Sequence, residues 1–132
     1  MKTWMNEQMW TSKYRLITFE CDRGLLTVTF NRPEQLNAVN AALHTEMSLL
    51  FGDIARDPSV RAVILTGAGR AFCAGGDLDW MKRARDFTPE ENRADAARLA
   101  RLLRTIYENP KPVVARVHGP AVAGGLGLVA AC

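Results

Sequence analysis

The chain has 132 residues, 48% of them hydrophobic, which is enough for one domain with a core of its own. The net charge of +3 is mild and the basic residues alternate with acids, which argues against a nucleic-acid partner or a membrane surface. Three cysteines without a CxxC spacing indicate a reducing compartment and favour neither disulfides nor a metal site. Residues 1–13 are interpreted as a flexible lead-in without the apolar run of a signal peptide, and the expected location is cytoplasmic.

The first half of the chain predicts two strands and a helix. Residues 14–22 and 24–30 alternate apolar and polar side chains, as a pair of half-buried strands does, and Gly24 suits the tight turn between them. Asn40 is a suitable N-cap for a helix that reaches Arg56 before Asp57 and Pro58. One face of that helix carries Leu43, Met47, Leu50 and Ile54.

The second half alternates strands and helices. Residues 60–67 form an apolar, β-branched run, predicted as a strand buried on both faces. Thr88 and Pro89 start a helix that ends near Asn109, and its predicted inward side chains are Leu99, Leu102, Leu103 and Ile106. Residues 112–119 are predicted as the last strand, followed by an apolar helix. The order predicts an α/β fold with parallel pairing after an opening hairpin.

Two glycine-rich turns each follow a buried strand and open a helix: Ala74-Gly75-Gly76 and Ala123-Gly124-Gly125. At such a junction free backbone N–H groups and the positive end of a helix dipole point outward together. One interpretation is an oxyanion hole, in which two N–H donors stabilise the charge that develops on a carbonyl oxygen. A purely structural joint is the main alternative. A phosphate or dinucleotide site is disfavoured, because TGAGRAFCAGG matches neither glycine-rich nucleotide motif.

Three stretches, NRPEQLNAVN, AVILTGAGRAFCAGGDLDWM and NPKPVVARVHGPAVAGGLGLVAAC, occur in the order and spacing of the enoyl-CoA hydratase/isomerase (crotonase) family. The resemblance covers residues 14–132 and implies the N-terminal portion of a single crotonase domain built of repeated ββα units. It implies acyl-CoA thioester substrates, coenzyme A as part of the substrate rather than a cofactor, and a homotrimer or hexamer. The implied activity is that of a hydratase/isomerase-type lyase that stabilises a thioester enolate, as in fatty acid metabolism.

The resemblance also implies the site residues. The thioester oxygen is expected on the backbone N–H groups of Ala74 and Gly124. The expected substrate-binding surface comprises Gln35, Leu36, Ala38, Ala74, Gly75, Gly76, Asp77, Leu78 and Gly124.

The catalytic acid or base departs from the family pattern. Gly127 stands where the classical hydratases of this family carry a catalytic glutamate, and a second glutamate common in the family would lie beyond Cys132. Hydratase and isomerase therefore both stay open, and the run DLDWM resembles only weakly the members that act on branched glutaconyl-type acyl-CoAs. The alternative is a catalytically incompetent fragment or a non-catalytic remnant that binds acyl-CoA or a partner, with Leu126, Leu128 and Val129 uncovered on the last helix.

Other candidates have structural interpretations. Asp77 is predicted as an N-cap rather than a catalytic acid, and Cys73 as a packed core residue rather than a nucleophile. His44 and His118 lack acidic partners at ligand spacing and are interpreted as structural or surface residues. Trp80, with Met81, either contacts the acyl chain or packs under the loop.

Overall fold

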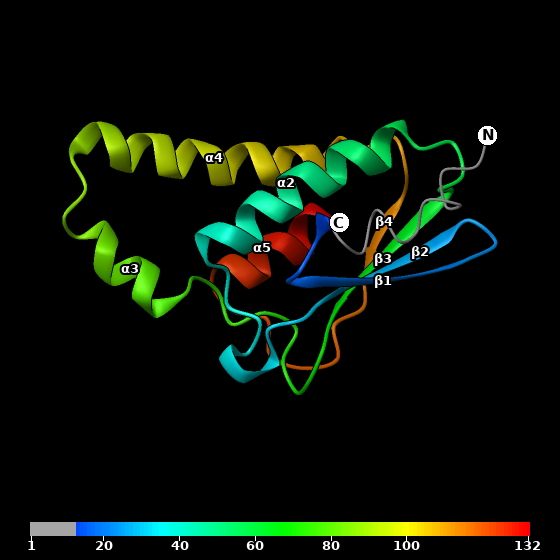
Figure 1. Cartoon of the computed structure of the whole chain (residues 1–132), viewed down its shortest axis with the longest axis horizontal. Coiled ribbons are helices and arrows are strands. Elements are labelled where there is room, and N and C mark those ends of the chain that lie inside the picture. Colours follow the sequence, from blue (N-terminus) through cyan, green and yellow to red (C-terminus); the bar gives the residue numbers. More distant parts are fainter. Residues whose placement is uncertain (1–12) are drawn as a thin grey trace.

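The computed structural model describes residues 13–132, which form a four-stranded sheet with helices (Figure 1). The elements in chain order are β1 (Ile17–Asp22), β2 (Leu25–Phe30), the 3-10 turn η2 (Pro33–Gln35), α2 (Ala41–Arg56), β3 (Ala62–Gly67), α3 (Leu78–Ala84), α4 (Pro89–Tyr107), β4 (Val113–Ala115) and α5 (Gly124–Ala131). Residues 1–12 of the expected lead-in lie outside the described residues. Lys13, the last of it, forms an ion pair of 2.8 Å with Asp53.

The sheet has the strand order β1-β2-β3-β4. β1 and β2 are antiparallel, whereas β2, β3 and β4 are parallel to one another. Arg23 and Gly24 alone connect the first two strands, and both have positive φ, 52° and 87°. Two consecutive residues of positive φ make the turn whose twist matches that of the flanking strands. The predicted hairpin and parallel pairing are confirmed.

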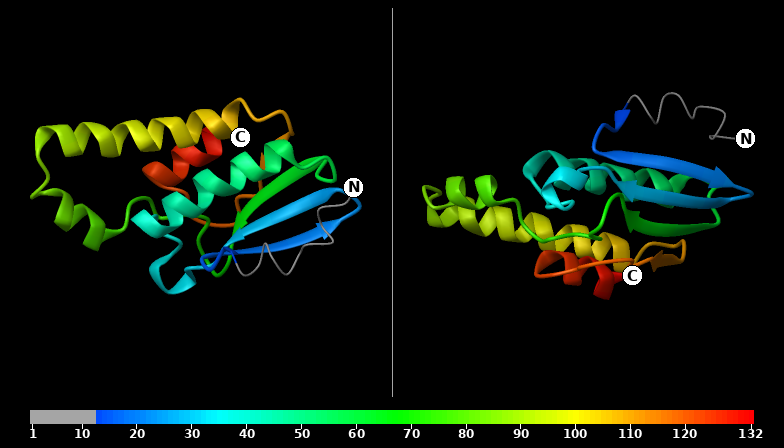
Figure 2. Two further views of the ribbon diagram at one scale, coloured as in Figure 1. Left: turned by 45° about the horizontal axis from the view of Figure 1, so that its top comes forward. Right: turned by 90° about the horizontal axis from the view of Figure 1, so that it is seen from below.

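Helix α2 provides much of the core between the sheet and the other helices (Figure 2). Its predicted inward residues Leu43, Met47, Leu50 and Ile54 are all fully buried. The Asn40 side chain accepts a hydrogen bond of 2.8 Å from the Leu43 N–H and so caps the helix as predicted.

Helix α4 packs against α2 and α5. Thr88 and Glu91 form a reciprocal capping box at its start. Leu102 is buried as predicted, but Leu99 is 39% exposed, so its assignment to the core was wrong. Leu128 of α5 is only 1% exposed because it joins the core cluster with α4, which corrects the expectation that this side chain is uncovered.

Two strand predictions need correction. β3 starts at Ala62, and its second face is only half buried, at Ile64 for example. The strand expected over residues 112–119 pairs with β3 only over Val113–Ala115. Farther along, Ala121 forms a bridge with Cys73 instead, so this stretch changes partner from strand β3 to the loop that follows it.

Within residues 13–132, no helix combines the length and the apolar character needed to cross a membrane.

Candidate active site

The first glycine-rich loop is anchored by Asn37, a fully buried polar residue that the sequence analysis did not single out. Its Nδ2 donates to the carbonyl oxygens of Ala68 (2.9 Å) and Ala71 (3.0 Å), and its Oδ1 accepts from the Arg32 N–H (2.9 Å). Asn37 has a φ of 57°, a left-handed conformation that asparagine tolerates better than most residues. The Asn37 side chain therefore connects the loop after β2 to the loop after β3.

The backbone N–H groups of the first loop have different partners. Ala74 N–H donates to the Leu36 carbonyl at 3.0 Å, and the Gly75 N–H lies close enough to the Cys73 sulfur to favour its thiolate. Gly76 N–H donates to no acceptor within residues 13–132. On either side of it, the Gly75 carbonyl accepts from Val39 N–H at 2.7 Å and Asp77 N–H donates to the Val39 carbonyl at 2.9 Å. The free N–H of this loop is thus at Gly76, and the expectation of a free donor at Ala74 was wrong.

The second glycine-rich loop lies directly against the first. Val122 N–H donates to the Cys73 carbonyl at 3.1 Å, and a side chain at Gly125 would collide with that same carbonyl, so only glycine fits there. Gly124 is the first residue of α5, and its N–H has no acceptor among residues 13–132. Its nitrogen lies 3.6 Å from the position that a Cβ of Gly75 would occupy. The two unused N–H groups therefore belong to adjoining segments.

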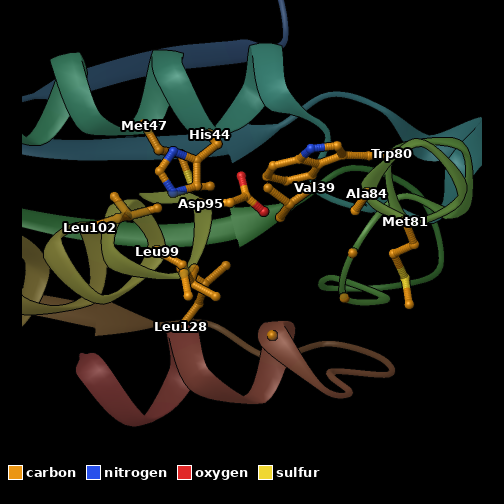
Figure 3. A pocket seen from close by; sticks show the side chains of 14 residues that line it. Val39, His44, Met47, Trp80, Met81, Ala84, Asp95, Leu99, Leu102 and Leu128 are labelled. Carbon is orange, nitrogen blue, oxygen red and sulfur yellow. The ribbon is translucent and has the colours of Figure 1, made fainter. Parts of the chain in front are cut away.

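A cavity of about 180 Å³ opens beside these loops, between α2, α3, α4 and α5 (Figure 3). Gly75, Gly76 and Gly124 line it. Most of its other walls are apolar. They are formed by Val39, Met47, Trp80, Met81, Ala84, Ala96, Leu99, Leu102 and Leu128, together with the polar residues His44 and Asp95.

The remaining residues expected at the substrate surface do not line this cavity: Gln35, Leu36, Ala38, Ala74, Asp77 and Leu78. Ala38 is buried, Gln35 is exposed, and Leu78 is 72% exposed. Trp80 and Met81 do line the cavity.

Asp77 is the N-cap of α3, as predicted. Its carboxylate accepts from the N–H groups of Asp79 (3.0 Å) and Trp80 (3.1 Å) and pairs with Arg32 at 3.2 Å. Burial acts to raise the pKa of this carboxyl, but these donors and the guanidinium outweigh burial and hold the pKa below its usual value. Asp77 is therefore an ionised residue that fixes the loop and the start of α3.

Two other candidates have the predicted structural roles. Cys73 is fully buried in the core cluster, and burial raises the pKa of its thiol, which opposes a nucleophilic role. His118 is exposed, with its Nε2 2.9 Å from the Gly69 carbonyl.

His44 has a position that the sequence did not reveal. It is 2% exposed, and its ring packs edge-on to Trp80 with 6.3 Å between the ring centroids. Burial and the nearby Arg98 lower its pKa below the usual value of 6.5. In Figure 3 the His44 ring and the Asp95 carboxylate both point into the cavity. The only signal in the sequence was that His44 precedes the inward residue Met47 by three positions, close to one helical turn.

The profile of the enoyl-CoA hydratase/isomerase family matches residues 20–132. The chain belongs to this family. It is 36% identical over 109 residues to the 1,2-epoxyphenylacetyl-CoA isomerase of Escherichia coli K12, covering 79% of this chain and 40% of that protein. It is 40% identical over 121 residues to the mitochondrial Delta(3,5)-Delta(2,4)-dienoyl-CoA isomerase of Mus musculus, covering 83% of this chain and 36% of that protein. The chain thus spans less than half the length of these relatives.

Solved structures agree with this assignment. An enoyl-CoA hydratase from Shewanella pealeana superimposes with a TM-score of 0.90 at 28% identity, over 94% of this chain and 47% of that one. An enoyl-CoA hydratase from Mycobacterium smegmatis gives a TM-score of 0.82 at 42% identity, over 90% of this chain and 46% of that one. The fold is the crotonase fold, as the sequence motifs predicted.

Proposed function

We propose that this chain supplies the thioester-binding part of an acyl-CoA hydratase or isomerase, with the N–H groups of Gly76 and Gly124 as an oxyanion hole. The observation that carries the proposal is that these two N–H groups have no acceptor within residues 13–132, while both residues line one cavity. Gly76 thus replaces Ala74 in the role inferred from the sequence, because the Ala74 N–H is already bonded to Leu36.

The chemistry follows from the charge that such donors stabilise. Removal of a proton next to a thioester carbonyl, or addition of water to a conjugated enoyl thioester, places negative charge on the carbonyl oxygen as an enolate forms. Two fixed N–H donors lower the energy of that enolate more than that of the neutral thioester. The apolar walls formed by Trp80 and Leu102 would receive the acyl chain and exclude water.

Other residues expected at the substrate surface would support the thioester site without lining the cavity. Gln35, Leu36 and Leu78 would form the surface for the coenzyme A arm. Asp77 positions the loop that carries Gly76, since its carboxylate already holds Arg32 and two backbone N–H groups.

The glycine at position 127 favours a second candidate function, in which the protein binds acyl-CoA without converting it. Gly127 brings no carboxylate to α5, and Asp95 is the one carboxylate among the residues that line the cavity in the described part of the chain. The oxyanion loops therefore carry no carboxylate that could transfer a proton. A lyase or isomerase step requires a carboxylate at another position in the protein.

Assembly into a homotrimer or hexamer is a further part of the proposal, and it rests on the family resemblance. Exposed apolar side chains on β4 and α5 support it, with Val114 and Leu126 each 59% exposed. Analytical ultracentrifugation of the full-length gene product tests it, and a monomer at micromolar concentration would contradict it.

The function is tested by calorimetric titration of the full-length gene product with crotonyl-CoA and with free coenzyme A, followed by a turnover assay. Tighter binding of the thioester, with hydration or isomerisation, supports the enzyme. Tighter binding of the thioester without turnover supports the second candidate. Equal binding of both ligands, or none, overturns the proposed thioester site.

A further inference from the structure

Among residues 13–132, Asp95 of α4 is the one carboxylate that lines the cavity beside the glycine-rich loops. In Figure 3 it points into that cavity, whose other walls are mostly apolar. Asp95 is half-buried, and its carboxylate forms no hydrogen bond or ion pair with any residue of 13–132. A half-buried carboxylate without a partner is unfavourable in such surroundings, so this one needs an explanation.

Helix α4 offers Asp95 a cation with which it does not pair. Arg98 follows by three positions, a spacing at which a carboxylate and a guanidinium are neighbours on a helix. The Arg98 guanidinium instead donates to the Thr45 hydroxyl of α2 at 3.4 Å. Farther along the same helix, Arg104 and Glu108 do form an ion pair of 3.0 Å. The Asp95 oxygens are therefore free to contact a molecule in the cavity.

His44 is the other titratable side chain of the cavity wall in the described part of the chain. Each of its ring nitrogens has less than 1 Å² of accessible surface, so a molecule in the cavity cannot contact them. The Asp95 oxygens also lack a partner but are not buried to that extent. Asp95 is thus the titratable group of residues 13–132 that a molecule in this cavity can contact.

We propose that the Asp95 carboxylate transfers the proton when a double bond shifts within a β,γ-unsaturated acyl thioester. The proposal rests on the thioester function proposed above and adds the catalytic residue that it lacked. A thioester whose oxygen lies at Gly76 and Gly124 extends its acyl carbons into the cavity that these residues line. The cavity of about 180 Å³ is close in size to the roughly 150 Å³ cavity that holds a benzene molecule, so an acyl group of about six carbons fills it and contacts Asp95.

The step balances without a further reactant. Asp95 takes a proton from the carbon next to the thioester carbonyl, and the electron pair of that C–H bond becomes part of a dienolate. The negative charge of the dienolate lies on the thioester oxygen, where the N–H groups of Gly76 and Gly124 stabilise it. The Asp95 carboxylic acid then returns the proton to the third carbon from the carbonyl. The double bond is now conjugated with the carbonyl, and the carboxylate is regenerated.

The test uses the full-length gene product, with trans-3-hexenoyl-CoA as the substrate and hexanoyl-CoA as a saturated ligand that cannot react. The ultraviolet absorbance of the conjugated product reports the double-bond shift, and calorimetry reports binding. We expect Asp95→Asn to slow the shift about 100-fold or more, while its affinity for hexanoyl-CoA stays within about twofold. Asp95→Glu keeps a carboxylate at this position and retains part of the rate.

Two measurements separate a catalytic role from a structural one. Glu90→Gln is the matched control, because it removes an exposed carboxylate of the same helix that does not line the cavity, and it leaves the rate unchanged. Asp95→Asn removes a negative charge from the cavity, so the affinity for the anionic enolate of acetoacetyl-CoA does not fall. A loss of enolate affinity as large as the loss of rate would make Asp95 a structural residue and overturn its catalytic role.

The outcomes also separate this inference from the function on which it rests. If the protein binds no acyl-CoA at all, the thioester function itself fails. If it binds hexanoyl-CoA but does not convert trans-3-hexenoyl-CoA, or if Asp95→Asn converts it at the unmodified rate, the role of Asp95 is overturned while the thioester site stands.

Discussion

Replacing Gly124 with proline removes one proposed donor without removing any internal hydrogen bond. The Gly124 N–H has no acceptor among residues 13–132, and Gly124 is the first residue of α5, a helix position at which proline is well tolerated. Proline also restricts the preceding residue, and Ala123 has a φ of 50° and a ψ of −120°, so circular dichroism first checks the fold of Gly124→Pro. A folded variant loses one contact to the enolate oxygen. Loss of one oxyanion donor costs about 3 kcal/mol, which corresponds to a factor of roughly 100 to 1000.

Acetoacetyl-CoA provides the assay, because its enolate carries the charged oxygen and its binding needs no catalytic base. The predicted affinity of Gly124→Pro for the enolate is about 100-fold or more below that of the unmodified protein. Gly124→Ala is the matched control: it keeps the N–H, and its Cβ would lie 4.0 Å from the Gly75 Cα, an ordinary contact. Equal enolate affinities for a folded Gly124→Pro and for Gly124→Ala would refute the reasoning.

Three further predictions concern single side chains. Asn37→Ala leaves the buried Ala71 carbonyl and the partly buried Ala68 carbonyl without a donor, and we expect it to lower the free energy of unfolding by about 3 kcal/mol in urea titrations. A loss below about 1 kcal/mol would show that the loops hold without this side chain. The pKa of His44 is lower in the folded chain than the usual 6.5, so the unfolded chain takes up a proton first and stability falls as pH drops below about 6.5. His44→Phe removes that dependence, and an unchanged pH profile of the melting temperature would contradict this assignment. A side chain fits at Gly127, because its Cβ would lie 3.7 Å from the Leu103 side chain, an ordinary contact. We expect Gly127→Glu to hydrate crotonyl-CoA faster than Gly127→Gln. Equal rates for the two variants would exclude a proton-transfer role at this position.

Local signals in the sequence predicted most of the fold. The hairpin at Arg23 and Gly24 needs positive φ at adjacent residues, and a glycine marks it. Asn40 and Thr88 cap their helices through hydrogen bonds to residues three positions ahead, so the sequence contains both partners. The three motifs identified the family because their order and spacing cover nearly the whole chain.

Hydrogen bonds between distant segments determine the features that the sequence did not predict. Whether Ala74 or Gly76 has a free N–H depends on Leu36 and Val39, about 37 residues earlier in the chain. The strand after α4 is short because its later residues pair with the loop at Cys73 rather than with β3. Such partners cannot be read from periodicity, which reports only the faces of an element.

The interior position of His44 escaped prediction for a similar reason. An isolated histidine on a helix is usually solvated or has a hydrogen-bond partner, and nothing in its neighbours along the chain indicates a cavity. The cavity exists because α3 and α4 bring Trp80 and Asp95 to the same place as His44.

The carbonyl stretching frequency of bound crotonyl-CoA, labelled with carbon-13 at the thioester, tests the central claim most directly. Two N–H donors on that oxygen polarise the bond, so we predict a shift to lower frequency than in water for the unmodified protein. The shift is smaller in Gly124→Pro and retained in Gly124→Ala. A bound thioester whose carbonyl frequency equals that in water would contradict an oxyanion hole at Gly76 and Gly124.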